Sequence, residues 1–293
     1  MITDREIEQG LTGIGLETED LVLVHGSLSS FGRVSGGADA LVNAILAIIG
    51  PKGTLVVPTF NYAPDAFHPD ETPSVVGAIT ETVRKHPNAL RSHHPTHSVA
   101  AIGPLAEQIT KDHEKVDPFG PGSALYKLFK LDGKVLLIGI GHTRNSMIHV
   151  AEELASVPYL DRVRQVTVKM PNGRLLTKII RRPGCSQGFD QIAESLETAG
   201  AIRQTHIGSS FVQLMSAGSI IKAATELTQE DPTALLCEQP DCQACAEARA
   251  MVVAHEEQVR EQELAAFLRD PVGEDIRPFE DSWDASENGE SRN

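Results

Sequence analysis

The stretch 21-LVLVHGSLSSFGRVSGGADALVNAI-45 changes character twice. Residues 21–25 are apolar up to a terminal histidine, a pattern typical of a strand buried on both faces. A segment rich in glycine and serine follows, and residues 40–49 then place apolar side chains at helical spacing. A tight turn needs no loop of this length, whereas a glycine-rich loop at a helix start presents backbone N–H groups to a phosphate. The stretch therefore predicts a buried strand, a ligand-binding loop and a helix.

Apolar runs and helical patterns continue to alternate along the first two-thirds of the chain. Short runs that are apolar throughout predict further strands at 54–60, 98–103 and 134–141. Helical spacing predicts helices at 75–86, 104–110, 123–131 and 146–155. Buried strands that alternate with helices are typical of α/β proteins. We therefore expect an α/β layered sandwich with a largely parallel or mixed central sheet flanked by helices.

The pattern changes after Tyr159. Segments 163–170 and 174–182 flank Asn172-Gly173, which predicts a β-hairpin with a tight turn. Further helices are expected at 191–200 and from about 241 to 268. The acidic segment 271–293 has no periodicity, so we expect it to be a flexible tail. The preceding 1–270 is long enough to form a single domain with a substantial core.

The net charge of −14 bears on the class of partner. Nucleic-acid binding requires a basic face, so such a chain is not expected to bind nucleic acid, whereas a cationic substrate would suit it. No apolar run approaches the roughly 20 residues needed to span a bilayer, so no membrane association is expected. The N-terminus MITDREIEQG does not resemble a secretory signal, which makes the cytoplasm the expected location.

Three of the four cysteines are close in sequence. Cys237, Cys242 and Cys245 form C-x4-C-x2-C, and the C-x-x-C part has the spacing of zinc ligands. A fourth ligand would have to come from Cys185 or a histidine. Reduced thiols without a metal are the alternative that a cytosolic protein favours, and a disulfide is the least expected.

Several segments, in order along the chain, carry a family resemblance. They are 24-VHGSLSSFGRVSGG-37, 91-RSHHPTHSVAAIG-103, 117-DPFGPGS-123 with 132-DGKVLLIGIG-141, 145-NSMIHVAE-152 and 184-GCSQGF-189. Together they resemble the aminoglycoside N3-acetyltransferase family over about residues 4 to 225. The resemblance implies a fold unlike that of the GNAT acetyltransferases. It also implies acetyl transfer from acetyl-CoA to the 3-amino group of a deoxystreptamine antibiotic. A homodimer is a further expectation, and the sequence does not determine the oligomeric state.

The resemblance implies that acetyl-CoA is bound mainly by elements within 20–141. The glycine-rich loop would cradle the pantetheine and pyrophosphate through Ser27, Leu28, Ser29, Phe31, Gly32, Val34, Gly36 and Gly37. Further CoA contacts are implied for Arg91, Ser92, His94 and Ser98. The residues alone leave two alternatives open for the second group. The cluster of His93, His94 and His97 suggests metal ligation, and the segment could also be ordinary packing.

His149 is the candidate general base, because an imidazole can take a proton from an ammonium group near neutral pH. It follows the strand 134–141, and α/β proteins place their sites at such strand ends. The family motif T-x-x-H-x-A-E is matched with Ser146 in place of threonine, and this hydroxyl would donate to the developing oxyanion. Glu152 is a candidate to orient His149 or to contact a cationic substrate. A carboxylate from the C-terminal third of the chain could orient His149 equally well.

The remaining candidates concern the substrate. His25 ends the first strand and is assigned to substrate or acyl positioning. Gly26 follows it where the family usually has serine, which removes one hydroxyl near the thioester. The candidates for holding an amino sugar are Thr59, Asn61 and Tyr62, together with Glu152. Loop carboxylates that could attract ammonium groups are Asp65, Asp70 and Glu71.

These observations predict an acetyl-CoA-dependent N-acetyltransferase that would confer aminoglycoside resistance by direct acetyl transfer to the 3-amino group of a 2-deoxystreptamine compound. No cysteine lies in the motifs that suggest catalysis, so no acyl-cysteine is indicated, and no catalytic metal is expected. One alternative is the same chemistry on a non-antibiotic amine. Two more are a metal-dependent hydrolase that uses the histidine cluster and an inactive CoA-binding protein.

Overall fold

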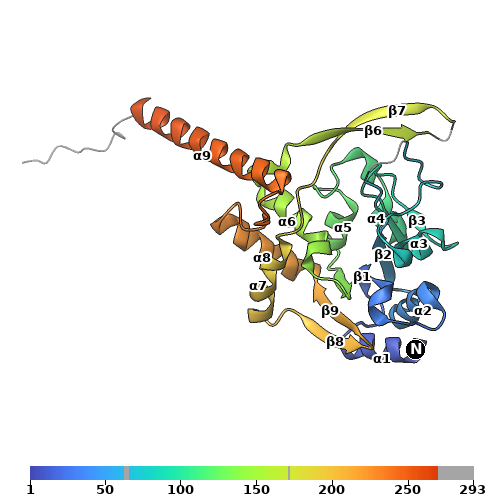
Figure 1. Ribbon diagram of the computed structural model, residues 1–293. Helices are drawn as coiled ribbons and strands as arrows, with labels where there is room; N and C mark the ends of the chain where they lie inside the picture. Colours follow the sequence, from blue (N-terminus) through green and yellow to red (C-terminus); the bar gives the residue numbers. More distant parts are fainter. Residues whose placement is uncertain (63–65, 171, 270–293) are drawn as a thin grey trace, which may run out of the picture. The chain divides into compact units, whose positions relative to one another are not determined.

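The computed structural model describes residues 1–62, 66–170 and 172–269. In these residues a seven-stranded sheet has the order β3-β4-β2-β1-β5-β9-β8 (Figure 1). The strands are β1 Leu21–Gly26, β2 Thr54–Pro58, β3 Leu90–Arg91, β4 Val99–Ile102, β5 Lys134–Ile138, β8 Arg203–Ile207 and β9 Ser210–Ser216. The helices are α1 Asp4–Gly13, α2 Gly37–Ile49, α3 Ala78–Lys85, α4 Ala106–Thr110, α5 Ala124–Lys130, α6 Met147–Ala155, α7 Ala193–Thr198, α8 Ala217–Glu230 and α9 Gln243–Arg269.

The sheet is mixed, which is one of the two arrangements expected from the sequence. The central strand β1 pairs in parallel with β2 and β5. The outer pairs β2–β4, β3–β4, β5–β9 and β8–β9 are antiparallel. Only the three strands at the centre are therefore parallel, and their carboxyl ends meet at one edge of the sheet.

Alternate side chains of the strands enter two separate cores. Leu23 and Leu137 pack with apolar residues of α4, α5, α6 and α8 on one face. Val22, Val24 and Leu136 pack with α1, α2 and α3 on the other. Both faces of the sheet are covered, which confirms the expected α/β layering and explains why the central strands are apolar throughout.

Five helices and strands were not predicted from the sequence: α1, β3, β8, β9 and α8. The edge strand β8 is mostly exposed and polar, so it lacks the apolar run that marks a buried strand. Helix α1 did leave a local signal, a capping box in which Thr3 and Glu6 bond to each other's backbone N–H groups. Ser123 caps α5, because its side chain accepts a hydrogen bond from the N–H of Tyr126.

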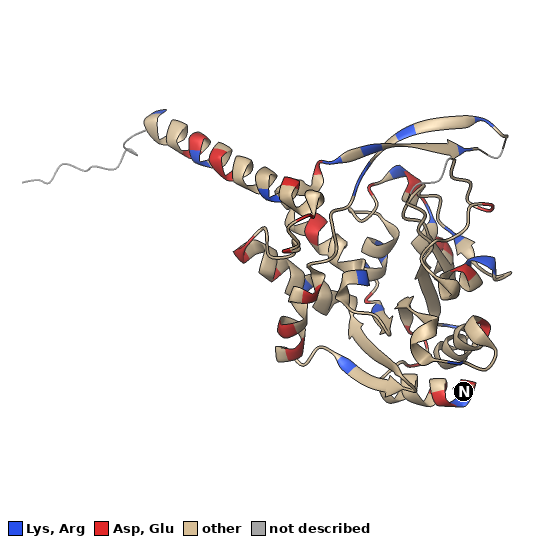
Figure 2. Ribbon diagram, viewed as in Figure 1, with Lys and Arg blue, Asp and Glu red and all other residues tan. Residues whose placement is uncertain are grey.

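The predicted hairpin is confirmed as the two-stranded pair β6 Val163–Lys169 and β7 Leu175–Arg181. Gly173 has φ +79° at the turn, a conformation that favours glycine. The sequence 163–182 contains six lysines and arginines and no acidic residue, and Figure 2 shows these positive charges along both strands. The hairpin is held to the segment before α3 by Phe67, whose N–H donates to Thr167 O at 2.9 Å.

The chain divides into a unit of residues 1–252 and a second unit that begins at Val253, with α9 crossing the boundary. The acidic segment 271–293, for which a flexible tail was expected, lies outside the described residues. None of the helices in the described part of the chain combines the length and the apolar character that crossing a membrane requires.

Candidate active site

A cleft of about 1190 Å³ lies at the carboxyl ends of the parallel strands. His25 and Gly26 from β1 and Pro58 from β2 form its floor, and the loop after β5 contributes Ile140. Loops at this edge of an open α/β sheet are where ligands bind. The predicted catalytic residues Ser146, His149 and His25 all line this cleft.

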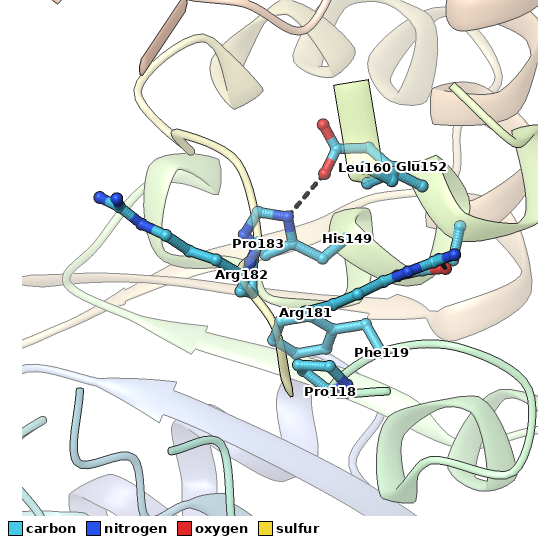
Figure 3. A pocket seen from close by; sticks show the side chains of 9 residues that line it. Pro118, Phe119, His149, Glu152, Leu160, Arg181, Arg182 and Pro183 are labelled. Carbon is cyan, nitrogen blue, oxygen red and sulfur yellow. Dashed lines mark hydrogen bonds and ion pairs between the residues drawn. The ribbon is translucent and has the colours of Figure 1, made fainter. Parts of the chain in front are cut away.

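His149 and Glu152 form a short hydrogen bond on α6 (Figure 3). His149 Nδ1 lies 2.6 Å from Glu152 Oε2, and Tyr159 donates its hydroxyl to Glu152 Oε1 at 2.9 Å. A carboxylate can only accept, so Nδ1 carries the proton and the lone pair of the neutral ring is on Nε2. Burial raises the pKa of Tyr159, which keeps its hydroxyl protonated as a donor. The chain Tyr159–Glu152–His149 therefore fixes both the ring orientation and its tautomer.

Glu152 is fully buried, and each of its two oxygens accepts a hydrogen bond from the protein. This arrangement favours the orienting role of Glu152 over contact with a substrate. Two aromatic rings also pack against the imidazole of His149. Phe119 stacks on the imidazole with centroids 4.9 Å apart, and Phe189 meets it edge-on at 4.8 Å.

The loop from Ser27 to Gly37 forms one wall of the cleft. It contains a short 3-10 helix, Leu28–Phe31, followed by Gly32, Gly36 and Gly37 at positive φ. Six of the eight CoA residues predicted in this loop line the cleft: Ser27, Leu28, Ser29, Gly32, Val34 and Gly37. Phe31 instead belongs to the core, and Gly36 is the N-cap residue that precedes α2. The first N–H groups of α2 are thus at the cleft, as a phosphate site requires.

His25 is buried, its Nε2 has no hydrogen-bond partner, and burial lowers its pKa to about 4. It is therefore neutral near pH 7 and suits a positioning role. The departure at Gly26 has a packing reason. A Cβ there would meet Ile138 Cβ at 3.0 Å and Ile79 Cδ1 at 3.1 Å, so this chain has little room for a side chain.

The second predicted group of CoA residues, Arg91, Ser92, His94 and Ser98, does not line the cleft. Arg91 donates to Thr59 O, Pro69 O and Thr72 O at 2.9, 2.8 and 2.5 Å, and burial lowers its pKa to about 10. Ser92, His94 and Ser98 are buried and hydrogen-bonded within the protein. The geometry favours packing for Arg91, Ser92 and Ser98, whose side chains are hydrogen-bonded within the protein, whereas the buried Nε2 of His94 has no hydrogen-bond partner among the described residues.

Of the candidates for substrate binding, some line the cleft and others do not. Tyr62 lines the cleft, whereas Thr59 is buried beneath Arg91 and Asn61 donates to Pro73 O at 3.2 Å. Asp65 lies outside the described residues. Glu71 pairs with Lys169 of the hairpin at 2.9 Å. The structure also brings three unpredicted arginines to the lining: Arg144, Arg164 and Arg182.

The sequence profile of the family described as aminoglycoside 3-N-acetyltransferase matches residues 23–229. The chain belongs to this family. Aminoglycoside N(3)-acetyltransferase IV of Salmonella sp is 31% identical over 229 residues, which cover 77% of this chain and 87% of that protein. Members of the aminoglycoside 3-N-acetyltransferase family are acyltransferases, and the expected family is confirmed.

Solved structures of aminoglycoside 3-N-acetyltransferases have the same fold. A histidine-to-alanine mutant of aminoglycoside acetyltransferase AAC(3)-IVa in complex with a gentamicin has a TM-score of 0.80 at 30% identity, covering 86% of this chain and 98% of that one. The binary structure of AAC-IIIb with CoASH has a TM-score of 0.72 at 26% identity, covering 78% and 96%. The expected layered fold is thereby confirmed.

Sequence reasoning missed Tyr159, Phe119 and Phe189 as parts of the acetyltransferase site. Phe119 and Phe189 lie inside the family-like segments 117–123 and 184–189, which was an available signal. Tyr159 comes seven residues after Glu152 and reaches it only because α6 ends at Ala155 and the chain turns back. The arginines of the hairpin have no local motif that could have placed them at the cleft.

Proposed function

We propose that this protein transfers the acetyl group of acetyl-CoA directly to the 3-amino group of a 2-deoxystreptamine aminoglycoside, with His149 as the general base. The observation that carries this proposal is the Tyr159–Glu152–His149 chain, which leaves His149 Nε2 as the basic nitrogen beside a cleft walled by the glycine-rich loop. The relatives solved with CoASH and with a gentamicin support the two substrates.

The residues divide the chemistry between them. His149 Nε2 takes a proton from the attacking amine, and Glu152 stabilises the imidazolium that forms. Ser146, at the start of α6, and nearby backbone N–H groups donate to the oxyanion as the amine nitrogen bonds to the thioester carbon. When the carbon–sulfur bond breaks, the proton held by His149 passes to the leaving thiolate. The fixed tautomer of His149 is what makes both proton transfers geometrically consistent.

The cleft also indicates how acetyl-CoA binds. We propose that the loop residues that line the cleft hold the pantetheine and pyrophosphate of acetyl-CoA. The three guanidinium groups at Arg144, Arg164 and Arg182 are suited to its phosphates. Catalysis by these residues requires no metal.

We further propose that the protein is cytoplasmic and has no nucleic-acid or membrane partner. We also propose that it forms a homodimer, which sedimentation equilibrium would test.

The experiment measures thiol release from acetyl-CoA with a panel of aminoglycosides, for wild type, His149→Ala and His206→Ala. His206 is an exposed histidine on β8, which makes it a matched control. The proposal expects release that depends on a 2-deoxystreptamine compound, survives His206→Ala and falls at least about 100-fold in His149→Ala. Equal activity in all three proteins would exclude His149 as the base.

A second candidate acceptor is favoured by one observation. The described residues that line the large cleft include three arginines and no aspartate or glutamate, although an aminoglycoside carries several ammonium groups. If the arginines bind the phosphates of acetyl-CoA, the remaining described lining has no carboxylate and suits an amine with fewer ammonium groups. Acetyl-CoA turnover with such amines but with none of the aminoglycosides would identify the acceptor as a non-antibiotic amine and leave the base assignment intact.

A metal-dependent hydrolase receives no support from the described residues. His94 and His97 are buried among protein contacts, and within this part of the chain no histidine belongs to a group of three or more metal-binding side chains. An inactive CoA-binding protein would bind acetyl-CoA without turnover, and the thiol-release measurement would show it.

A further inference from the structure

All four cysteines of the chain meet at one place. Cys185 follows β7, Cys237 follows α8, and Cys242 and Cys245 stand at the start of α9. Their four sulfur atoms lie within 4.8 Å of one another, although 52 residues separate Cys185 from Cys237. Among the described residues this is the only group of three or more side chains placed to hold a metal ion.

The sulfur distances suit a tetrahedral ion rather than a disulfide. A zinc–thiolate bond of about 2.3 Å places the sulfurs of a regular ZnS₄ tetrahedron about 3.8 Å apart. Cys185 Sγ and Cys237 Sγ are 3.9 Å apart. A disulfide would need a sulfur–sulfur distance of about 2.05 Å, and it would use only two of the four thiols.

The protein around the sulfurs is arranged to keep them in place. Cys237 and Cys245 are buried, and they pack with Val157, Tyr159 and Leu160. The N–H of Gln187 points at Cys185 Sγ at 3.4 Å, and Arg249 donates to the carbonyl of Cys237 at 3.0 Å. Outer contacts of this kind orient metal ligands, and a cationic group offsets the negative charge of four thiolates.

The segments that carry Cys185 and Cys237 approach each other unusually closely. A Cβ at Gly188 would lie 2.5 Å from Leu235 O and 2.8 Å from Cys237 N. Glycine is therefore needed where the loop after β7 passes the chain after α8. This backbone contact brings Cys185, the residue without a C-x-x-C partner, to the other three.

We propose that Cys185, Cys237, Cys242 and Cys245 bind a structural Zn²⁺ ion. Four thiolates fill a tetrahedral shell and leave no open position for a substrate, so the ion has no catalytic role. Binding releases the thiol protons and involves no oxidation. The inference goes beyond the acetyltransferase activity and does not depend on it.

The ion would fasten one wall of the active-site cleft. Residues 184–187 line the cleft, and Cys185 lies within them. Tyr159, which orients Glu152, packs in the same cluster as Cys237 and Cys245. The zinc therefore joins the cleft wall and the support of His149 to the start of α9, and it closes a long loop of chain.

The first test is elemental analysis of the full-length wild-type protein after purification under reducing conditions and exposure to EDTA. The proposal expects about one zinc per chain. Cys185→Ser and Cys242→Ser, which change the two less buried thiols, should reduce the zinc content at least tenfold. His93→Ala, which removes an exposed histidine of the other candidate metal cluster, should leave the zinc content unchanged.

Substitution of cobalt for zinc in the wild-type protein provides a second measurement, which does not require any variant to fold. Protein prepared with Co²⁺ should show the thiolate-to-metal absorption and the visible bands of a tetrahedral S₄ site. Wild-type protein without stoichiometric zinc would overturn the proposal, as would stoichiometric iron in its place. A mass two or four daltons below that of the reduced chain would also overturn it, because it would show disulfides. Zinc lost in His93→Ala but retained in the cysteine variants would assign the ion to the histidines instead.

Discussion

At the residue scale, the carboxylate of Glu152 controls which nitrogen of His149 is basic. It accepts from Nδ1 at 2.6 Å, and its other oxygen is held by Tyr159. An amide at this position would accept a weaker hydrogen bond and would not stabilise the imidazolium. We therefore propose that Glu152 acts through His149 as a positioning residue.

We expect Glu152→Gln to lower kcat about 100-fold with a smaller change in the KM for acetyl-CoA. The measurement is steady-state thiol release as a function of acetyl-CoA concentration, which separates the change in kcat from the change in KM. Glu153→Gln is the matched control, because Glu153 lies on the same helix but pairs with Arg181 at 3.1 Å. Equal losses in the two variants would contradict the positioning role.

Buried histidines make stability depend on pH. Burial lowers the pKa of His113 to about 4, and the ring is held by Ser92 and by Pro118 O. In the unfolded chain the same group titrates near 6.5. Below pH 6.5 the unfolded state therefore binds more protons than the folded state. His113 contributes its whole stabilisation above that pH, and the free energy of unfolding falls as the solution is acidified towards pH 4.

We expect His113 to contribute a loss of roughly 2 kcal/mol in the free energy of unfolding between pH 7 and 5. The measurement is urea unfolding at several pH values for wild type and His113→Asn. The variant will be less stable at pH 7, but its stability should fall less steeply with acidification. His206→Asn, at an exposed site, should keep the wild-type slope. An unchanged slope in His113→Asn would rule out this linkage.

At the scale of elements, Arg91 fastens the segment after β2 to the short strand β3. Its guanidinium donates to three carbonyls of that segment and lies over the ring of Phe67, 5.2 Å from the centroid. Removing the donors would leave buried carbonyl groups without partners.

We expect Arg91→Met to lower the free energy of unfolding by about 3 kcal/mol. The KM for acetyl-CoA should stay the same at a temperature where the variant is folded, because Arg91 does not line the cleft. Denaturant unfolding and kinetics measure the two effects. Arg174→Met, at an exposed position of the hairpin, should change neither. A large rise in KM without loss of stability would restore the CoA-contact role.

The glycine-rich loop rests on the end of β5. Gly139 has φ +63°, and a Cβ there would lie 2.0 Å from Ser30 Oγ. An added methyl group must therefore displace the 3-10 helix of the loop as well as strain the backbone.

We expect Gly139→Ala to raise the KM for acetyl-CoA about tenfold, because displacing a binding loop by about 1 Å has effects of this size or larger. Gly13→Ala in α1 is the control, because a Cβ there meets nothing within 4 Å. That substitution should leave the KM unchanged and raise stability slightly. An unchanged KM in Gly139→Ala would show that the loop does not hold acetyl-CoA.

The sequence predicted the elements whose pattern is local. Buried strands such as 21–25 and amphipathic helices such as 40–49 were found because their apolar spacing suffices. The edge strand β8 was not, since its partner β9 rather than its own composition stabilises it. The site shows the same division. His149 and Glu152 are one helical turn apart, whereas the structural roles of Arg91 and Ser98 depend on which chain passes over them.

At the scale of the whole molecule, binding of acetyl-CoA should be separable from its turnover. We expect CoA at 100 times its Kd to stabilise both wild type and His149→Ala by about 2.7 kcal/mol. The measurement is thermal unfolding with and without CoA. A shift in wild type but not in His149→Ala would mean that this histidine holds the cofactor, which would contradict its assignment as a base.

The arrangement of the central sheet also constrains how the chain folds. β5 lies between β1, more than 100 residues earlier, and β9, more than 70 residues later. The basic hairpin and α6 intervene between β5 and β9. During synthesis β5 can pair with β1, but its other edge stays open until the chain has been made through Ser216. Sheets built from such distant pairings fold slowly, and an open edge can pair with another chain. Newly made protein should therefore be most prone to aggregation just before β9 emerges from the ribosome.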